Sequence, residues 1–81
     1  MPISGIVIRI DPVQRAGVVS RLESLAGLEL QPSPPGDRLV AVLDTADFQA
    51  EEKLVKTISD TDGVSNVAVA YHNFEDMSSD L

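Results

Sequence analysis

One stretch of the sequence, residues 63–72, constrains the fold most, because its side chains alternate in direction while both alternating sets are largely apolar. The two sets are Val67, Val69 and Tyr71 on one side and Ala68, Ala70 and His72 on the other. Strands that are apolar on both faces usually lie in the middle of a sheet and are covered on both sides. The pattern therefore predicts a central strand, with helices on one face and a different covering on the other.

Six elements are predicted along the chain, in the order β-α-β-β-α-β. The predicted strands are residues 3–10, 28–31, 38–43 and 63–72, and the predicted helices fill 11–27 and 47–62. Asp11 before Pro12 is a typical helix start, and the acidic residues around Asp47 suit the start of the second helix. This order predicts the α+β, ferredoxin-like fold, with two helices on one face of a four-stranded antiparallel sheet. We expect the first and last strands at the centre and residues 28–31 at an edge.

The length of the chain limits the kind of site that it can build. With 81 residues it is one small domain, which buries only about 60–65% of the surface of its unfolded chain and leaves no room for a deep cleft. We expect the domain to span residues 1–73 and to be followed by a flexible acidic tail, residues 74–81. A shallow surface is the expected site.

Composition excludes several classes of function. A net charge of −7 repels nucleic acid and anionic membranes, so any charged partner is expected to be basic. The absence of cysteine removes disulfides, thiolate metal sites and cysteine nucleophiles. The start of the sequence has no basic region and cleavage site typical of an export signal, and no apolar run is long enough to span a membrane. A cytoplasmic protein is predicted.

The sheet face opposite the helices is the candidate site. On this face we expect the odd-numbered residues of the first strand and the even-numbered residues of the third and fourth strands. They form an apolar trough made of Val7, Val40, Val42, Ala68 and Ala70. The predicted rim of the trough consists of Arg9, Glu29, Gln31 and His72. The other face, lined by Ile6, Ile8, Ile10, Leu39, Ala41, Leu43, Val67, Val69 and Tyr71, is expected to meet the helices. Adjoining apolar side chains left uncovered indicate a binding surface or a subunit interface.

Enzymatic functions are not favoured by these residues. The loop after the first strand has no glycine-rich cradle for an anion, and His72 has no Ser or Cys partner in a recognisable motif. We therefore expect a non-enzyme that acts as a binding module. The alternative is a regulatory, sensor-type ferredoxin-like domain that binds a small molecule and dimerises.

Four segments carry a resemblance to a known family: residues 63–72 followed by Glu75, and residues 3–8, 25–30 and 36–43. Together they resemble the NapD family, the cytoplasmic assembly chaperones of periplasmic nitrate reductase. The resemblance implies a chaperone that binds the twin-arginine signal peptide of the catalytic subunit and delays export until cofactor insertion is complete, and that holds no cofactor itself. Its partner would be that peptide, with no nucleic acid and no direct membrane binding, and the chaperone would be a monomer or weak homodimer.

The implied partner fits the predicted surface. A twin-arginine signal joins a basic segment to an apolar segment of about 7–15 residues, so a receptor for it needs an apolar trough beside carboxylates. The carboxylates predicted to receive the arginines are Glu29, Glu75 and Asp76, because arginine binds carboxylates with two parallel hydrogen bonds. Arg9 and His72 are predicted rim contacts.

Overall fold

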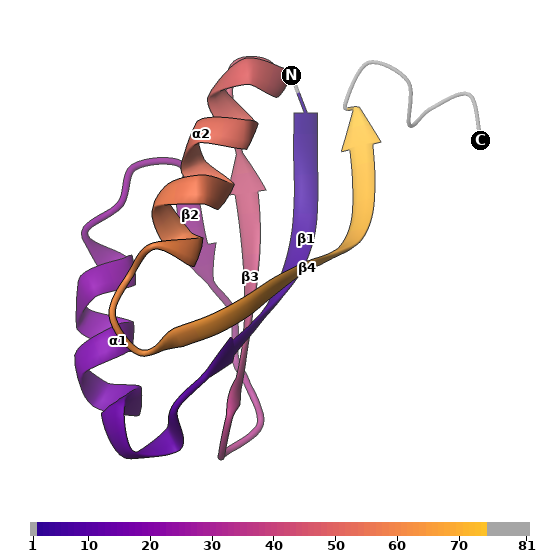
Figure 1. Cartoon of the computed structure of the whole chain (residues 1–81). Helices are drawn as coiled ribbons and strands as arrows, with labels where there is room; N and C mark the ends of the chain where they lie inside the picture. The colour runs from indigo at the N-terminus through magenta and orange to yellow at the C-terminus, as the bar shows by residue number, and fades with distance from the viewer. Residues whose placement is uncertain (1, 75–81) are drawn as a thin grey trace.

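The predicted strands form one antiparallel sheet in the computed structural model, which describes residues 2–74 (Figure 1). The elements are β1 (Pro2–Ile10), the 3-10 turn η1 (Pro12–Gln14), α1 (Arg15–Glu23), β2 (Leu28–Leu30), β3 (Arg38–Asp44), α2 (Phe48–Ser59) and β4 (Val64–Phe74). Both helices lie on the same side of the sheet (Figure 1). The ferredoxin-like β-α-β-β-α-β arrangement is therefore confirmed.

The order of the strands is β2-β3-β1-β4, so β1 and β3 are central and β2 and β4 are edges. The prediction of an edge at residues 28–31 is confirmed, whereas the prediction that the last strand is central is wrong. β4 pairs with β1 alone, because β3 occupies the other side of β1. An uncovered sheet face can carry apolar side chains on an edge strand as well, so the two-sided pattern of residues 63–72 did not identify a central position.

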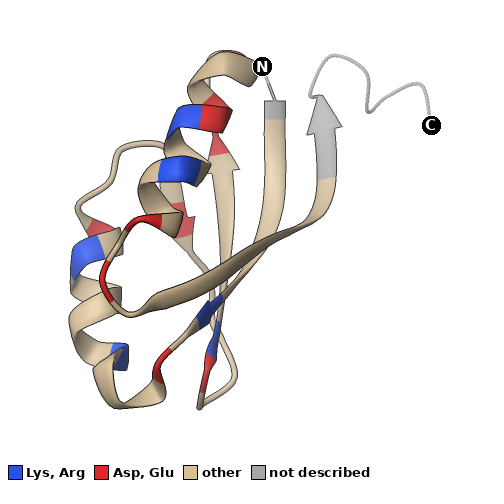
Figure 2. Ribbon diagram, viewed as in Figure 1, with Lys and Arg blue, Asp and Glu red and all other residues tan. Residues whose placement is uncertain are grey.

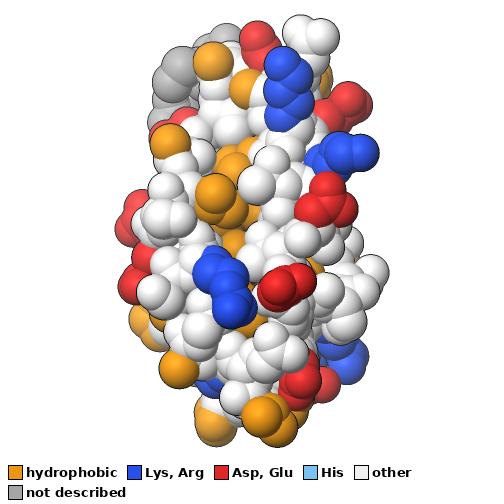
Figure 3. Space-filling view, turned by 60° about the vertical axis from the view of Figure 1, so that its left-hand side comes forward, with side chains coloured by type: hydrophobic (Ala, Val, Ile, Leu, Met, Phe, Trp, Pro, Cys, Tyr) orange, Lys and Arg blue, Asp and Glu red, His pale blue; other side chains and the backbone are white. Residues whose placement is uncertain are grey.

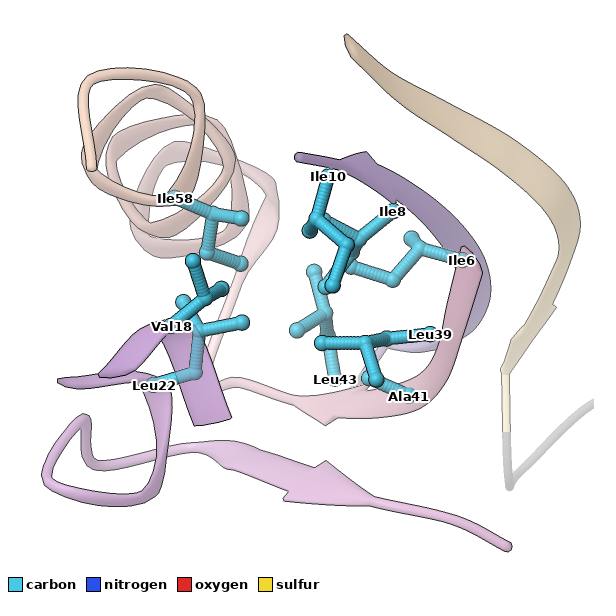
Figure 4. Packing of buried hydrophobic residues seen from close by; sticks show 9 residues of the cluster. All are labelled: Ile6, Ile8, Ile10, Val18, Leu22, Leu39, Ala41, Leu43 and Ile58. Atoms are coloured by element: carbon cyan, nitrogen blue, oxygen red, sulfur yellow. The ribbon is translucent and has the colours of Figure 1, made fainter. Parts of the chain in front are cut away.

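The core lies between the helices and the inner face of the two central strands (Figure 4). Its buried side chains are Ile6, Ile8 and Ile10 of β1, Leu39, Ala41 and Leu43 of β3, Val18 and Leu22 of α1, and Ile58 of α2. The alternation along β1 and β3 predicted these faces correctly. Burying one such aliphatic side chain stabilises the fold by about 1.5–3 kcal/mol, so this layer is the main source of stability.

Apolar side chains are exposed at the first turns of both helical segments and on β4. Val13 is 91% exposed. It lies in the 3-10 turn η1, in which successive side chains are about 120° apart around the axis rather than about 100° as in an α-helix, so Val13 points away from the apolar side of α1. Phe48 at the start of α2 is 52% exposed. Val69 of β4, expected under the helices, is 44% exposed, since α2 leaves part of the edge strand uncovered.

Local capping signals behave as the sequence indicates. The side chain of Asp11 accepts a hydrogen bond from the Val13 backbone N–H, and that of Asp47 accepts one from the Ala50 backbone N–H at 2.8 Å. Each cap satisfies a backbone donor that has no partner within its own helix. Gly63 has a φ of +91°, a left-handed conformation that suits glycine, and it begins the turn into β4.

One polar contact lies inside the apolar layer. Glu51 of α2 is 5% exposed, and its carboxyl group accepts a hydrogen bond from the hydroxyl of Ser4, which is fully buried on β1. A buried polar group without a partner is costly, so the two side chains stabilise each other's burial. The contact joins residues 47 positions apart in sequence and fixes α2 against the central strand.

Replacing Ser4 by alanine is expected to lower the free energy of unfolding by about 1–3 kcal/mol, because it removes a donor from a buried carboxyl group. Chemical denaturation measures the change. Ser20→Ala is the matched control, since Ser20 is exposed on α1, and its effect should stay within about 0.5 kcal/mol. Equal effects of the two substitutions would contradict a stabilising role for the Ser4–Glu51 contact.

Candidate functional site

The sheet face opposite the helices, here called the open face, is not covered by any part of residues 2–74 (Figure 1). The strand register aligns its residues in rows that cross the sheet. One row contains Glu29, Val42, Gly5 and Tyr71, and the next contains Val40, Val7 and Ala68. The structure therefore brings together four of the five residues predicted for the apolar trough.

The middle of the open face is apolar and only partly exposed to water. Val7, Val40 and Val42 are half-buried by one another, and Ala68 is exposed beside them on β4. Ile3 of β1 adds a further half-buried side chain at one end of the same face. Their short and branched side chains produce a shallow apolar surface, which is the kind of surface that an apolar segment of a partner can bury.

A bulge in β4 changes which residues of this strand reach the open face. Ile6 pairs with Val69 and Gly5 pairs with Tyr71, so Ala70 is the extra residue between them. Beyond the bulge the alternation is shifted by one position. The prediction that Tyr71 faces the helices is therefore wrong, and Ala70 lies at the bulge rather than in a regular row of the trough.

The ring of Tyr71 lies directly over Gly5. A methyl group added to Gly5 would fall 2.0 Å from the Cε1 atom of the ring, so only glycine leaves room for it. Tyr71 remains 51% exposed, with one side of the ring against the sheet. The open face thus carries a large aromatic side chain that the alternation of residues 63–72 assigned to the opposite face.

The remaining predicted site residues lie at the end of β4 or beyond it. In the register of the sheet, the backbone of His72 pairs with that of Ser4 in β1, and the predicted rim contact of His72 stays a prediction. Glu75 and Asp76 lie outside the described residues. Their predicted contact with arginines stays a prediction.

An acidic hollow lies at the end of the open face where β3 finishes. It has a volume of about 320 Å³ and is lined by Ile3, Gly27, Leu28, Glu29, Val42 and Asp44. The carboxylates of Glu29 and Asp44, both exposed, stand beside an apolar floor. Asp44 was missed as a site residue because the predicted strand ended at residue 43, although the alternation 38, 40, 42, 44 places it on the open face.

The opposite end of the open face is basic. Arg9 pairs with Arg38 in the strand register, and the Arg9 guanidinium lies 3.3 Å from a carboxylate oxygen of Asp37. Arg15 of α1 donates to the backbone carbonyl of Gly36 at 2.8 Å and thereby holds the loop before β3. Figure 2 shows the basic residues of β1 and β3 at the end of the sheet remote from the acidic end of β3. The face is therefore polarised along its strands.

Within residues 2–74, no three His, Cys, Asp or Glu side chains gather as a metal site. In the same residues, neither α1 nor α2 has the length and apolar character needed to cross a bilayer.

Comparison with known protein families matches residues 1–76 to the family described as NapD protein. The chain belongs to the NapD family. The resemblance found in the sequence is thereby confirmed over nearly the whole chain.

A solved structure supports the fold of this NapD-family chain. The solution structure of the E. coli Tat proofreading chaperone protein NapD superposes with a TM-score of 0.80 and 20% sequence identity, covering 90% of this chain and 78% of that one. At this identity the similarity establishes the shared fold. No curated protein sequence matches the chain.

The contact of Tyr71 with Gly5 can be tested by substitution. Gly5→Ala forces the ring off the strand and is expected to lower the free energy of unfolding by about 1–3 kcal/mol, as overpacking does. Adding Tyr71→Ala should recover part of this loss, because the clash disappears. Thermal denaturation of the three variants measures both effects.

Gly17→Ala is the matched control for this experiment. Its methyl group would meet the flexible guanidinium of Arg21 at 3.3 Å, and alanine in a helix is favoured over glycine by about 0.5–1 kcal/mol. We expect this control to be neutral or stabilising. A Gly5→Ala variant as stable as the original protein would show that the ring does not occupy the position described.

Proposed function

We propose that this protein is a chaperone that binds the twin-arginine signal peptide of the periplasmic nitrate reductase catalytic subunit on its open face. Binding takes place in the cytoplasm and delays export until the cofactor of that subunit has been inserted. The observation that carries the proposal is an apolar surface with an acidic hollow at one end. Membership of the NapD family and the structural similarity to the E. coli Tat proofreading chaperone protein NapD support it.

The dimensions of the open face suit an apolar helix. Residues 3–9 of β1 span the face, and six residue steps of about 3.3 Å give roughly 20 Å. A helix of about 13 residues has the same length, since each residue adds about 1.5 Å. The apolar part of a signal peptide falls in this range. One side of such a helix would cover Val7, Val40, Val42 and Ala68 and bury the exposed side of the Tyr71 ring.

The charges of the open face set the direction of the peptide. Its twin arginines lie at the acidic hollow, where Glu29 and Asp44 accept hydrogen bonds from the guanidinium groups. The apolar segment then runs along the strands toward Arg9 and Arg38, where these arginines would repel a peptide bound in reverse. An exposed acidic site also attracts a basic peptide from solution, in a manner that added salt weakens.

The chaperone activity would be passive. Binding covers the apolar and twin-arginine parts of the signal together, so the export machinery cannot engage either part. The family and the described residues suggest no catalytic step, and we propose that the chaperone requires no cofactor of its own.

Ala68→Glu places a carboxylate in the middle of the apolar surface and is expected to weaken binding of the signal peptide at least about tenfold, because the charge must be desolvated or displaced. Isothermal titration calorimetry with the synthetic peptide measures the affinity. Ala16→Glu, on the exposed side of α1, is the control with the same chemistry and should bind like the original protein. Undiminished affinity of Ala68→Glu would exclude the open face.

A second titration tests the acidic hollow. Glu29→Gln and Asp44→Asn should each lower the affinity for the signal peptide about threefold to thirtyfold and reduce its dependence on salt. The same substitutions should leave the affinity unchanged for a peptide whose two arginines are glutamines, because the lost interaction is absent from it. Equal losses for both peptides would show that the arginines bind elsewhere.

A further inference from the structure

Apart from its bulges, the edge formed by β4 carries none of the features that usually protect an exposed strand. β4 is 11 residues long, and its sequence contains no charged residue and no proline. The other edge, β2, has only three residues, carries Glu29 and is followed by Pro32, Pro34 and Pro35. Charges, prolines and short length are the common means of preventing edge pairing. Within residues 2–74, the β2 edge is therefore well protected, whereas only its bulges protect the β4 edge from pairing with another strand.

Exposed apolar side chains gather beside the same edge. Between α2 and β4 lies a hollow of about 470 Å³, lined by Phe48, Glu51, Glu52, Val55, Lys56 and Val69. Phe48 and Val69 are each about half exposed although they lie on the helix side of the sheet. Figure 3, which brings the helix side of the molecule forward, shows apolar side chains exposed between charges of both signs. A partner that extends the sheet at β4 would bury this apolar surface.

Two charged residues of the hollow, Glu52 and Lys56, could form ion pairs between two copies of the chain that are related by a two-fold rotation. Glu52 and Lys56 are one helical turn apart on α2, are exposed, and have no ion-pair partner among the described residues. A two-fold axis perpendicular to the sheet would place a second α2 antiparallel to the first on the same side of the sheet. Glu52 of each copy would then face Lys56 of the other, as a self-complementary interface requires.

We propose that two copies of this protein associate through antiparallel pairing of their β4 strands, which joins the two sheets into one of eight strands. The axis passes near Val69, so that the two Val69 side chains and the two Phe48 rings close the hollow. A second copy fits better than an unrelated segment, because this chain supplies both charges of the interface in the required order. The open face remains free in both copies.

This inference does not depend on the proposed function, and its test requires no peptide. The measurement is the mass of the full chain by light scattering and sedimentation over a range of protein concentrations. Val69→Lys should weaken association at least about tenfold, because it places two like charges beside the axis. A protein that stays monomeric into the millimolar range, or a dimer that Val69→Lys leaves unchanged, would overturn the proposal.

A charge exchange separates this interface from other modes of association. Glu52→Lys replaces two attractive pairs by two repulsive ones and should weaken the dimer about threefold to tenfold. The double variant Glu52→Lys with Lys56→Glu restores the pairs and should recover the original affinity. Glu23→Lys, an equal change of charge on the exposed surface of α1, should leave association unaffected or slightly favoured. If the double variant did not recover the original dimer affinity, the interface would lie elsewhere. Circular dichroism verifies that each variant is folded.

Discussion

The alternation of side chains along β1 is the constraint on which both faces of the sheet depend. Its even-numbered residues, Ile6, Ile8 and Ile10, are at most 3% exposed and form the central row of the core. The odd-numbered residues belong to the open face. A slip of one residue in the register of β1 would move its core side chains to the open face and break their match with both neighbouring strands. The buried contact of Ser4 with Glu51 adds a polar match that only the observed register satisfies.

The bulge at Ala70 is the main departure from this regular pattern, and it determines the character of the open face. One extra residue in β4 transfers Tyr71 from the helix side to the open side, where Gly5 leaves space for the ring. The Tyr71 ring extends the apolar surface toward the β4 edge, and Gly5 beneath it contributes no side chain of its own. Glycine in a central strand weakens it, so the position of Gly5 reflects the close approach of the ring.

Much of the fold could be predicted because its signals are local. Strict alternation identified the core faces of β1 and β3, and Asp11 and Asp47 were recognised as caps from their own neighbourhoods. The edge position of β4 depends on which strands pair across the whole chain, and a run of valine and alanine does not contain that information. The bulge and the partner of Glu51 also depend on contacts between residues far apart in the sequence. Within the candidate site, Val7, Val40, Val42 and Ala68 followed from periodicity, whereas Asp44 was missed because it lies one residue beyond the predicted end of its strand.

The location of Tyr71 has a practical consequence. The chain contains no tryptophan and this one tyrosine, so its ultraviolet emission arises almost entirely from a single phenol ring. That ring rests on the floor of the open face with half of its surface in water. The protein therefore carries a built-in optical probe at the place of interest, and unlabelled material suffices to follow the arrival of any non-fluorescent molecule there.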